Sequence, residues 1–321
     1  MVDFNPLNKI IMLVQSKLYI IIAITGLAAL SSCGKSGGNS GNTGNTGGNN
    51  PPGNTITVNP FTTTATCDYD INDTTLTNHG WTKAFDDEFS GDLSNWGIGV
   101  GGMQGVLQCN EAANAQIVNG VLQITTKHET VTGPKTVNND TTATFDFTSA
   151  LLTSKQSFSA NNTTPKVRLV ARVKVSRGYG VTSLFWTYGS GAWPTTGEID
   201  CLEAQGNTTT RYATDYKFGT TPGKSSASGT LLYNPVTEDL ANCYHVYTME
   251  WTKNSLTSYL DGNLVEVKTA GGYINNLFGT SQNVSLGVPV GGWFYDSTLK
   301  TSDIQCGGTM YVDYVKVFTS N

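Results

Sequence analysis

The sequence has few charged residues and lacks the apolar periodicity of long helices. Asp, Glu, Lys and Arg make up 13% of its 321 residues, against roughly 25% in an average soluble domain. No stretch repeats apolar residues over a long 3.6-residue period, so long helices are not expected. The formal net charge of −5 gives no basic footprint for nucleic acid, which we therefore do not expect as a partner.

A hydrophobic run long enough to span a bilayer is also lacking near the N-terminus. The apolar run from Leu18 to Leu30 follows Lys9 and Lys17, and its about thirteen residues fall short of the about twenty in a transmembrane helix. Such a run is typical of an export signal. Its last residues, Leu30-Ser31-Ser32-Cys33, resemble a bacterial lipobox. We therefore predict a lipoprotein signal peptide at 1–32 and a lipid on Cys33. The exported protein is then anchored to a membrane, at the bacterial outer membrane or the cell surface.

Two other interpretations of the N-terminus stay open. The run also fits an ordinary secretory signal with an incidental cysteine, and Met12 followed by Lys17 also makes a well-proportioned signal if Met12 is the true start. Residues 34–60 are nearly all Gly, Asn, Ser, Thr and Pro, which bury little apolar surface. We predict a flexible tether at 33–60, an N-terminal extension at 61–79 and one folded domain at 80–321.

The cysteines left after Cys33 are odd in number. In an oxidising compartment they favour disulfides, and at least one thiol has to stay free. We expect Cys201 to be free because it lies within the segment richest in carboxylates. The other four allow three pairings, among which the sequence does not choose: Cys67, Cys109, Cys243 and Cys306.

Short runs of β-branched and aromatic residues, separated by turn residues, predict an all-β fold. Asn119-Gly120 and Asp261-Gly262 stand between such runs and are strong hairpin signals. A short helix is expected near Asn275–Phe278. The predicted strands are Val121–Thr126, Val167–Val175, Thr182–Trp186, His245–Trp251, Ser255–Leu260, Asn283–Val288 and Met310–Phe318. We expect mostly antiparallel strands in two packed sheets.

The segment from Trp193 to Glu203 carries three carboxylates within six residues, Glu198, Asp200 and Glu203. Acidic residues are depleted from strands, so three together in a strand-like segment need a reason. Side chains alternate along a strand, which places Glu198 and Asp200 on one face and Glu203 on the other. A β-bulge near Cys201-Leu202 absorbs one residue and returns Glu203 to the face of the other two.

Two glutamates on one face suit a retaining glycosidase. One glutamate attacks the anomeric carbon, and the other protonates the leaving oxygen and later deprotonates water. Asp200 between them shares a hydrogen and keeps their protonation states distinct. On spacing alone, a solvated strand face or a cation site remains an alternative.

This segment resembles the signature of glycoside hydrolase family 16 in its bulged Glu-x-Asp-x-x-Glu form, which is associated with laminarinases, agarases and carrageenases. The resemblance covers essentially the whole domain. Its further segments are Phe85–Gly91, Leu93–Trp96, Asn119–Thr125, Tyr244–Trp251, Tyr259–Gly262, Val290–Trp293 and Met310–Val315.

The resemblance implies a concanavalin-like β-jelly-roll sandwich with an open cleft, and a polysaccharide as substrate. It implies Glu198 as nucleophile, Glu203 as acid/base and Asp200 as their assistant, with no cofactor for catalysis. Trp193 and Trp293 match positions that line the family's cleft. We also expect Trp186 to stack on sugars, since a pyranose face packs on an aromatic ring, and we expect a monomer.

Two further points follow from the resemblance. Glu88 and Asp313 resemble residues that hold a structural Ca²⁺ in many relatives, through the oxygen ligands that this ion requires. Relatives that act on glucans often carry a histidine in the strand after the signature, and Arg211–Gly219 contains none. This departure leaves the substrate more open than the reaction.

Three functions compete. We favour an endo-hydrolase of β-1,3- or mixed-linkage β-glucan of the laminarin or lichenan type. The same chemistry on a galactan such as agar or carrageenan is an alternative, in which Arg211, Lys217 and Lys224 meet sulfate groups. A non-catalytic surface glycan-binding lipoprotein is a third, although retention of both glutamates argues against it.

Overall fold

The computed structural model describes residues 56–58, 62–137, 139–224, 227–228, 232–269, 273–296 and 298–321. The chain divides into a unit of residues 1–48 and a unit of residues 49–321, and all described residues belong to the second. The predicted signal peptide, Cys33 and most of the tether lie outside the described residues. Within the described ranges, no helix is both long enough and apolar enough to cross a membrane.

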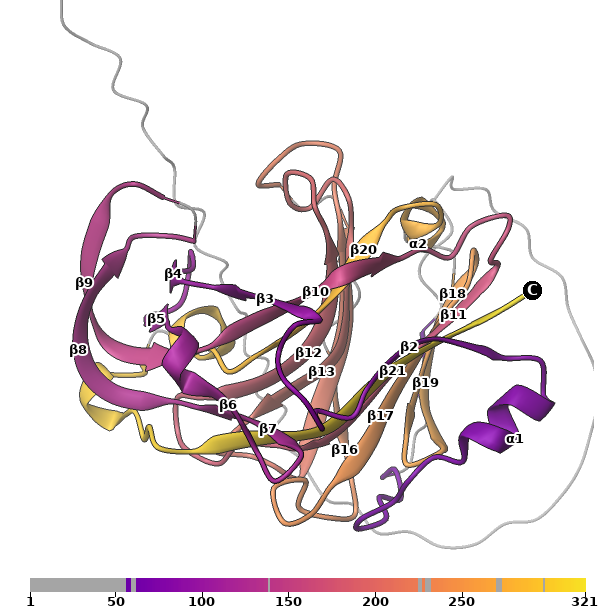
Figure 1. Cartoon of the computed structure of the whole chain (residues 1–321), viewed down its shortest axis with the longest axis horizontal. Coiled ribbons are helices and arrows are strands. Elements are labelled where there is room, and N and C mark those ends of the chain that lie inside the picture. Colours follow the sequence, from indigo (N-terminus) through magenta and orange to yellow (C-terminus); the bar gives the residue numbers. More distant parts are fainter. Residues whose placement is uncertain are drawn as a thin grey trace, which may run out of the picture. The chain divides into compact units, whose positions relative to one another are not determined.

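Two large antiparallel sheets form the body of this unit (Figure 1). Sheet 1 has the order β1 (Ile56–Val58), β19 (Asn263–Thr269), β18 (Ser255–Leu260), β17 (His245–Trp251), β11 (Lys166–Lys174), β21 (Thr309–Ser320), β7 (Val121–Thr125) and β6 (Ala115–Val118), and β2 (Thr82–Asp87) also pairs with β21. Sheet 2 has the order β15 (Ala227–Ser228), β14 (Arg211–Phe218), β13 (Glu198–Gln205), β12 (Thr182–Gly189), β20 (Gln282–Gly287), β10 (Leu151–Phe158) and β3 (Trp96–Gly99), and β16 (Leu232–Pro235) also pairs with β14.

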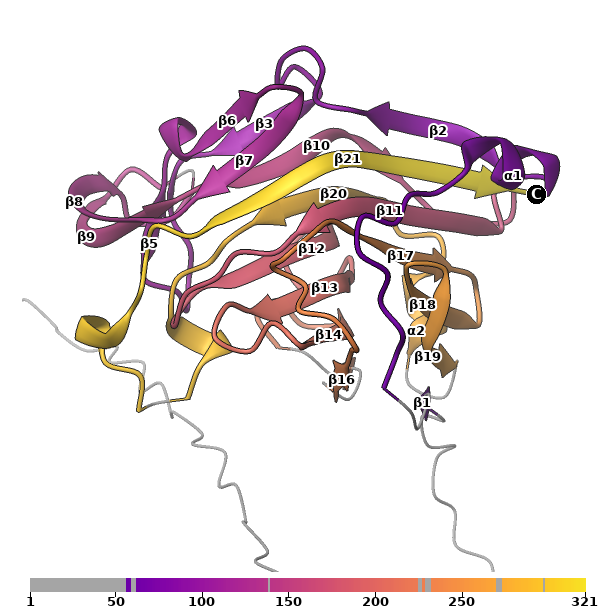
Figure 2. The ribbon, with the colours of Figure 1, turned by 90° about the horizontal axis from the view of Figure 1, so that it is seen from below.

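A smaller sheet lies at one end of the unit, away from helix α1 (Figures 1 and 2). It has the order β4 (Gly101–Gly102), β5 (Gln108–Asn110), β9 (Thr142–Ser149) and β8 (Lys127–Pro134). The short helices are α1 (Asp73–Asn78), α2 (Ile274–Leu277), η1 (Ala112–Asn114), η3 (Gly292–Phe294) and η4 (Thr301–Asp303).

The main core lies between sheets 1 and 2. Leu169 and Ala171 of β11 and Ile199 and Leu202 of β13 belong to one buried apolar cluster. Burying a leucine or isoleucine side chain contributes about 1.5–3 kcal/mol. Inward-facing residues of both sheets therefore hold the sandwich together and fix which face of β13 points outward.

The sequence predicted this architecture closely. Strands β17 and β18 have the predicted bounds, and α2 lies within one residue of the expected short helix. Asn119 and Gly120 have φ values of 53° and 77°, and Asp261 and Gly262 have 50° and 78°. Positive φ at both central residues is what a type I′ hairpin turn requires, so both predicted hairpins are confirmed.

The N-terminal extension covers the outer face of sheet 1. Tyr69, Ile71 and Leu76 pack on a second buried cluster that includes Val170 of β11 and Val246 of β17. Because of this contact, part of sheet 1 has apolar packing on both of its faces.

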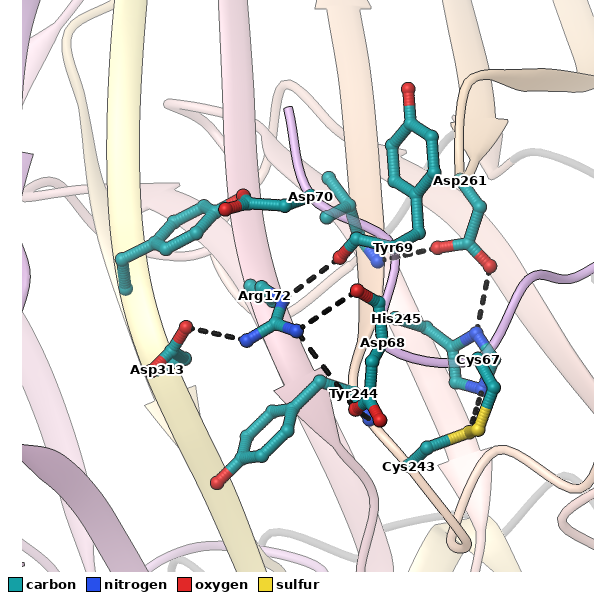
Figure 3. A network of polar contacts seen from close by, with 12 residues as sticks. Cys67, Asp68, Tyr69, Asp70, Arg172, Cys243, Tyr244, His245, Asp261 and Asp313 are labelled. Atoms are coloured by element: carbon teal, nitrogen blue, oxygen red, sulfur yellow. Dashed lines mark hydrogen bonds and ion pairs between the residues drawn. A yellow bond between two sulfur atoms is a disulfide. The ribbon is translucent and has the colours of Figure 1, made fainter. Parts of the chain in front are cut away.

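Polar contacts and a disulfide also hold the extension in place (Figure 3). Cys67 forms a disulfide with Cys243. Arg172 Nε donates to the carbonyl oxygen of Tyr69 at 2.8 Å, and the Thr66 amide donates to Asp261 Oδ2 at 2.8 Å. Asp261 Oδ2 also lies 2.7 Å from Nδ1 of His245, a buried side chain with a structural role.

The cysteines are only partly as predicted. Cys201 is free, as expected. Cys67 and Cys243 pair, but Cys109 and Cys306 are both free, so the expectation of a second bridge was wrong. Cys109 is enclosed within the smaller sheet, where a Cβ added at Gly133 would lie 2.7 Å from its sulfur.

Candidate active site

Strand β13 presents its three carboxylates to the outer face of sheet 2. Asp200 lies opposite Asp215 on β14 and Glu203 lies opposite Ala213, so three steps along β13 face two steps along β14. On the β12 side of β13, the consecutive residues Phe185 and Trp186 lie opposite Leu202 and Asp200, so one residue of β13 is again left without a partner. The sequence predicted a β-bulge at this point. Because one residue is absorbed there, Glu203 shares the outer face with Glu198 and Asp200.

The carboxylates of Glu198 and Asp200 have few hydrogen-bond donors. Glu198 Oε2 accepts a hydrogen bond of 2.7 Å from Trp193 Nε1. Asp200 is 3% exposed, and its Oδ2 has no hydrogen-bond partner among the described residues. A buried carboxylate without donors favours its protonated form, because the charged form has lost its hydration.

Burial raises the pKa of all three carboxyls. The pKa of Glu198 rises to about 7, although Lys217 and the Trp193 hydrogen bond oppose the effect of burial. The pKa of Glu203 rises to about 8, through burial and the negative charge of Asp200. The pKa of Asp200 lies well above its usual range because of burial and the nearby charge of Glu198. Glu203 therefore keeps its proton to a higher pH than Glu198, which suits Glu203 to donate a proton and Glu198 to attack as a nucleophile.

Strand β14 adds two charged groups to this face, Asp215 and Lys217. Lys217 Nζ donates to Asp215 Oδ2 and lies 3.9 Å from Asp200 Oδ2. The contact of Lys217 with a sulfate group, expected for a galactan substrate, stays a prediction, and its ammonium is already paired with the carboxylate of Asp215. The alternation of Ala213, Asp215 and Lys217 along the strand after the signature was the signal that could have placed them here.

Two exposed tryptophans stand near opposite ends of β13. Trp193, 36% exposed, bonds to Glu198 at the start of the strand. Trp293, 69% exposed, belongs to η3, which is tied to the end of the strand because Gln205 Nε2 donates to the Phe294 carbonyl oxygen. Both indoles are exposed, and their stacking on a sugar chain stays a prediction.

Trp186 lies between them on β12. It is paired with Asp200 across the strands and is stacked with Tyr188, with ring centroids 6.5 Å apart at 18° between planes. Its ring is partly exposed. The three predicted tryptophans thus border the same three carboxylates, and Tyr188 joins them as an aromatic that the sequence did not single out.

The two residues predicted to hold calcium have basic partners. Glu88 Oε1 lies 2.8 Å from Lys316 Nζ, and Asp313 Oδ2 lies 2.6 Å from Arg172 Nη1 (Figure 3). Among the described residues, no three His, Cys, Asp or Glu side chains gather into a group that could hold a metal. A cation at either carboxylate would have to displace an ion pair. Calcium binding stays a prediction, and these contacts argue against it.

Comparison with known protein families shows the family of the chain. Residues 112–316 match the model of glycosyl hydrolases family 16. The chain belongs to this family. It is 26% identical over 262 residues to the glucan endo-1,3-beta-glucosidase A1 of Niallia circulans, covering 78% of this chain and 37% of the relative. It is 29% identical over 251 residues to the clotting factor G alpha subunit of Tachypleus tridentatus, covering 74% of this chain and 34% of the relative. The chain thus spans about a third of the length of these two relatives.

Other family members match over nearly their full length. A glucan endo-1,3-beta-glucosidase of Cryptopygus antarcticus is 29% identical over 268 residues, covering 76% of this chain and 94% of the relative. The X-ray structure of the endo-beta-1,3-glucanase from Pyrococcus furiosus superposes with a TM-score of 0.60 at 25% identity, covering 75% of this chain and 95% of that one. The jelly-roll fold predicted from the sequence is confirmed.

Proposed function

We propose that this chain is a retaining endo-hydrolase of β-1,3- or mixed-linkage β-glucan. The observation that carries the proposal is the register shift in β13, which places Glu198, Asp200 and Glu203 on one open face. The chain then has the bulged Glu-x-Asp-x-x-Glu form of its family, the form associated with laminarinases, agarases and carrageenases.

The reaction follows from the protonation states. A Glu198 carboxylate oxygen attacks the anomeric carbon and forms a glycosyl ester, while the bond to the leaving oxygen breaks and Glu203 transfers its proton to that oxygen. Glu203, now ionised, takes a proton from water. The water oxygen attacks the anomeric carbon, the ester bond breaks, and Glu198 is released as a carboxylate. Two inversions leave the β-configuration unchanged.

Asp200 supports both steps from its buried position. Burial and the charge of Glu198 raise the pKa of its carboxyl well above the usual range, which favours the protonated form. A protonated Asp200 donates a hydrogen bond to Glu198 when that carboxylate is free, and this bond weakens when Glu198 becomes an ester. The aspartate therefore stabilises Glu198 as a leaving group in the second step.

The relatives and the aromatic residues favour a neutral glucan. Relatives from Niallia circulans and Cryptopygus antarcticus are named glucan endo-1,3-beta-glucosidases. Trp193 and Trp293 offer exposed rings, and Lys217 is held by Asp215 rather than open to an anionic substituent.

A sulfated or otherwise acidic galactan is the second candidate, and one residue favours it. Arg211 has no ion pair among the described residues, and its guanidinium lies 4.5 Å from the ring centroid of Tyr233. A relative from Sphingobacterium multivorum, 28% identical over 165 residues, is named a keratan-sulfate endo-1,4-beta-galactosidase.

A panel of polysaccharides tests these alternatives. We expect reducing ends to appear with laminarin and lichenan and not with agarose, carrageenan or keratan sulfate. If reducing ends appeared only with a galactan, the second candidate function would replace the first. Binding of laminarin with no release from any polysaccharide would instead show a glycan-binding protein, the function named for a shorter-matching relative from Penaeus monodon.

We also propose that the chain is an exported lipoprotein, tethered to a membrane through Cys33 and acting as a monomer. The lipobox-like residues before Cys33 support this proposal. A Cys33→Ala variant is expected to lose incorporation of a fatty-acid analogue. Equal incorporation by both forms would overturn it.

A further inference from the structure

The two glutamates face different residues across the strand pair. Glu198 lies opposite Lys217 on β14, whereas Glu203 lies opposite Ala213. Directly opposed residues on one face have Cβ atoms about 4.5–5.5 Å apart. Glu198 therefore has a lysine directly across the strand pair and Glu203 has an alanine. The charge of Lys217 acts to lower the pKa of both glutamates.

Lys217 is held firmly in this position. Its side chain is 24% exposed, and its Nζ forms an ion pair with Asp215, whose side chain is 2% exposed. Asp215 is itself fixed, since its Oδ1 accepts a hydrogen bond of 2.8 Å from the Tyr216 amide. Lys217 Nζ also lies 3.9 Å from Asp200 Oδ2. The ammonium is therefore anchored between two buried carboxylates on the Glu198 side of the bulge.

A second basic residue of β14, Arg211, shares this face two positions beyond Ala213, where its guanidinium lies 4.5 Å from the ring centroid of Tyr233. Lys268 of β19 lies on the other side of β14, where it bonds to Glu266 and Thr214. The titratable and charged groups that face the two glutamates, or act on them and their neighbours, come from five strands: Tyr188 on β12, Asp200 and Glu203 on β13, Arg211, Asp215 and Lys217 on β14, Tyr233 on β16, and Glu266 and Lys268 on β19.

We propose that Lys217, anchored by Asp215, is the positioning residue that assigns the two roles, because its charge keeps Glu198 ionised while Glu203, opposite Ala213, stays protonated. The proposal rests on the proposed retaining mechanism. Lys217 touches neither substrate nor reacting atoms in this account, and acts through Glu198. The two glutamates are chemically the same, so residues of the neighbouring strand contribute to the difference between their pKa values that the mechanism needs.

A substrate-independent titration tests the charge effect. The chain has eight glutamates, few enough to follow by ¹³C NMR of labelled carboxyls, with Glu198 and Glu203 assigned through Glu198→Gln and Glu203→Gln. In Lys217→Met we expect the Glu198 midpoint to rise by about one pH unit or more, since an opposite charge at this range shifts a pKa by about 1–3 units. The Glu203 midpoint should rise less. Lys217→Arg, which keeps the charge, should stay near the wild type.

A kinetic measurement then tests the role. A 2,4-dinitrophenyl 2-deoxy-2-fluoro-β-laminaribioside has a leaving group that needs no acid, so its inactivation rate reports the nucleophile alone. We expect the acid limb of this rate to move upward by about one pH unit or more in Lys217→Met, and to return toward the wild type in Lys217→Arg. Lys155→Met, which removes an exposed lysine from β10 of the same sheet, is the matched control and should not move the limb.

The outcomes separate the two proposals. An unchanged Glu198 midpoint in Lys217→Met, or equal shifts of both glutamates, would overturn the role of Lys217 whatever the substrate. A shifted Glu198 midpoint in a protein that neither hydrolyses β-glucan nor reacts with the inactivator would support the charge effect and overturn the proposed function. If Lys217→Met does not fold, Lys217→Gln takes its place, with the same expected shift.

Discussion

The two outer faces of the sandwich carry charge in different ways. On sheet 1, next to the N-terminal extension, basic side chains are matched by acidic ones, and Arg172 and Lys316 each have two acidic partners. The pairs include Arg168 with Glu250, Arg172 with Asp313 and Lys316 with Glu88. On sheet 2, four carboxylates gather around one lysine. They are Glu198, Asp200, Glu203 and Asp215, around Lys217.

The difference separates stability from function. Paired charges at a partly exposed surface contribute about 0–1 kcal/mol each and do little chemistry. An excess of half-buried carboxylates destabilises the fold, because like charges repel and burial removes their hydration. Such an arrangement is retained where shifted pKa values are useful. We therefore expect substitutions on sheet 2 to change mainly activity, and substitutions on sheet 1 to change mainly stability.

The largest effect is expected from the glutamates of sheet 2. Glu198→Ala and Glu203→Ala should each lower kcat by more than about a thousandfold, because each removes a group that acts in the transition state. Sodium azide distinguishes them. With an activated β-glycoside, Glu198→Ala should yield the α-glycosyl azide by one inversion, and Glu203→Ala the β-glycosyl azide by two. Reversed products would exchange the two roles.

The next largest effect is expected on sheet 1. Replacing Cys67 and Cys243 by Ala removes the link that holds the extension. The free energy of unfolding should fall by about 2–5 kcal/mol, measured by denaturant titration, while kcat/KM stays unchanged because sheet 2 is not touched. Cys306→Ala, which removes a free thiol, is the control. A parallel loss of activity in the folded double variant would mean that the two faces are not independent.

Substrate stacking is expected to contribute less. Trp193→Ala or Trp293→Ala should weaken binding by about 1–3 kcal/mol, the scale of burying one large side chain, seen as a higher KM on laminarin. Trp193→Phe keeps an aromatic ring but loses the indole N–H that bonds Glu198, so it should recover KM more than kcat. Unchanged kinetics in both alanine variants would assign these rings to folding alone.

A separate effect concerns stability against pH. The pKa values of about 7 for Glu198 and about 8 for Glu203 lie above those of unfolded glutamates, about 4.3. The folded state therefore binds more protons between about pH 4 and 8, and stability from these groups is lost as pH rises through that window. Glu198→Gln and Glu203→Gln should raise Tm at pH 8 more than at pH 5. Equal changes at both pH values would show that burial does not raise these pKa values.

The same pKa values predict the pH dependence of activity. Hydrolysis needs Glu198 ionised and Glu203 protonated, so kcat/KM should be bell-shaped with limbs near about 7 and about 8. The acid limb belongs to Glu198 and should be the one that responds to substitution of Lys217.

Sequence patterns were informative where strands are buried on at least one face. The β-branched and aromatic residues of His245–Trp251 and Ser255–Leu260 predicted both strands to the residue, and the spacing of Glu198, Asp200 and Glu203 predicted the register shift in β13. Burial of Ile199 and Leu202 requires that shift, because without it Glu203 would enter the core.

Elements without a buried face escaped prediction. Strand β8 is exposed or half-exposed at nearly all positions, so its sequence shows no apolar period. Pairing of Cys67 with Cys243, 176 residues apart, depends on where the extension crosses sheet 1. The ion pairs of Glu88 and Asp313 depend on Lys316 and Arg172, which adjacent strands bring close and no local pattern reveals.

The configuration of the first product tests the retaining mechanism most directly. Wild-type enzyme and a soluble β-1,3-glucan oligosaccharide would be followed by ¹H NMR from the first minutes, before mutarotation mixes the anomers. The mechanism from Glu198 and Glu203 predicts that the β-anomer of the new reducing end appears first and the α-anomer follows by mutarotation. Appearance of the α-anomer first would contradict it, since it would require a single inversion by water.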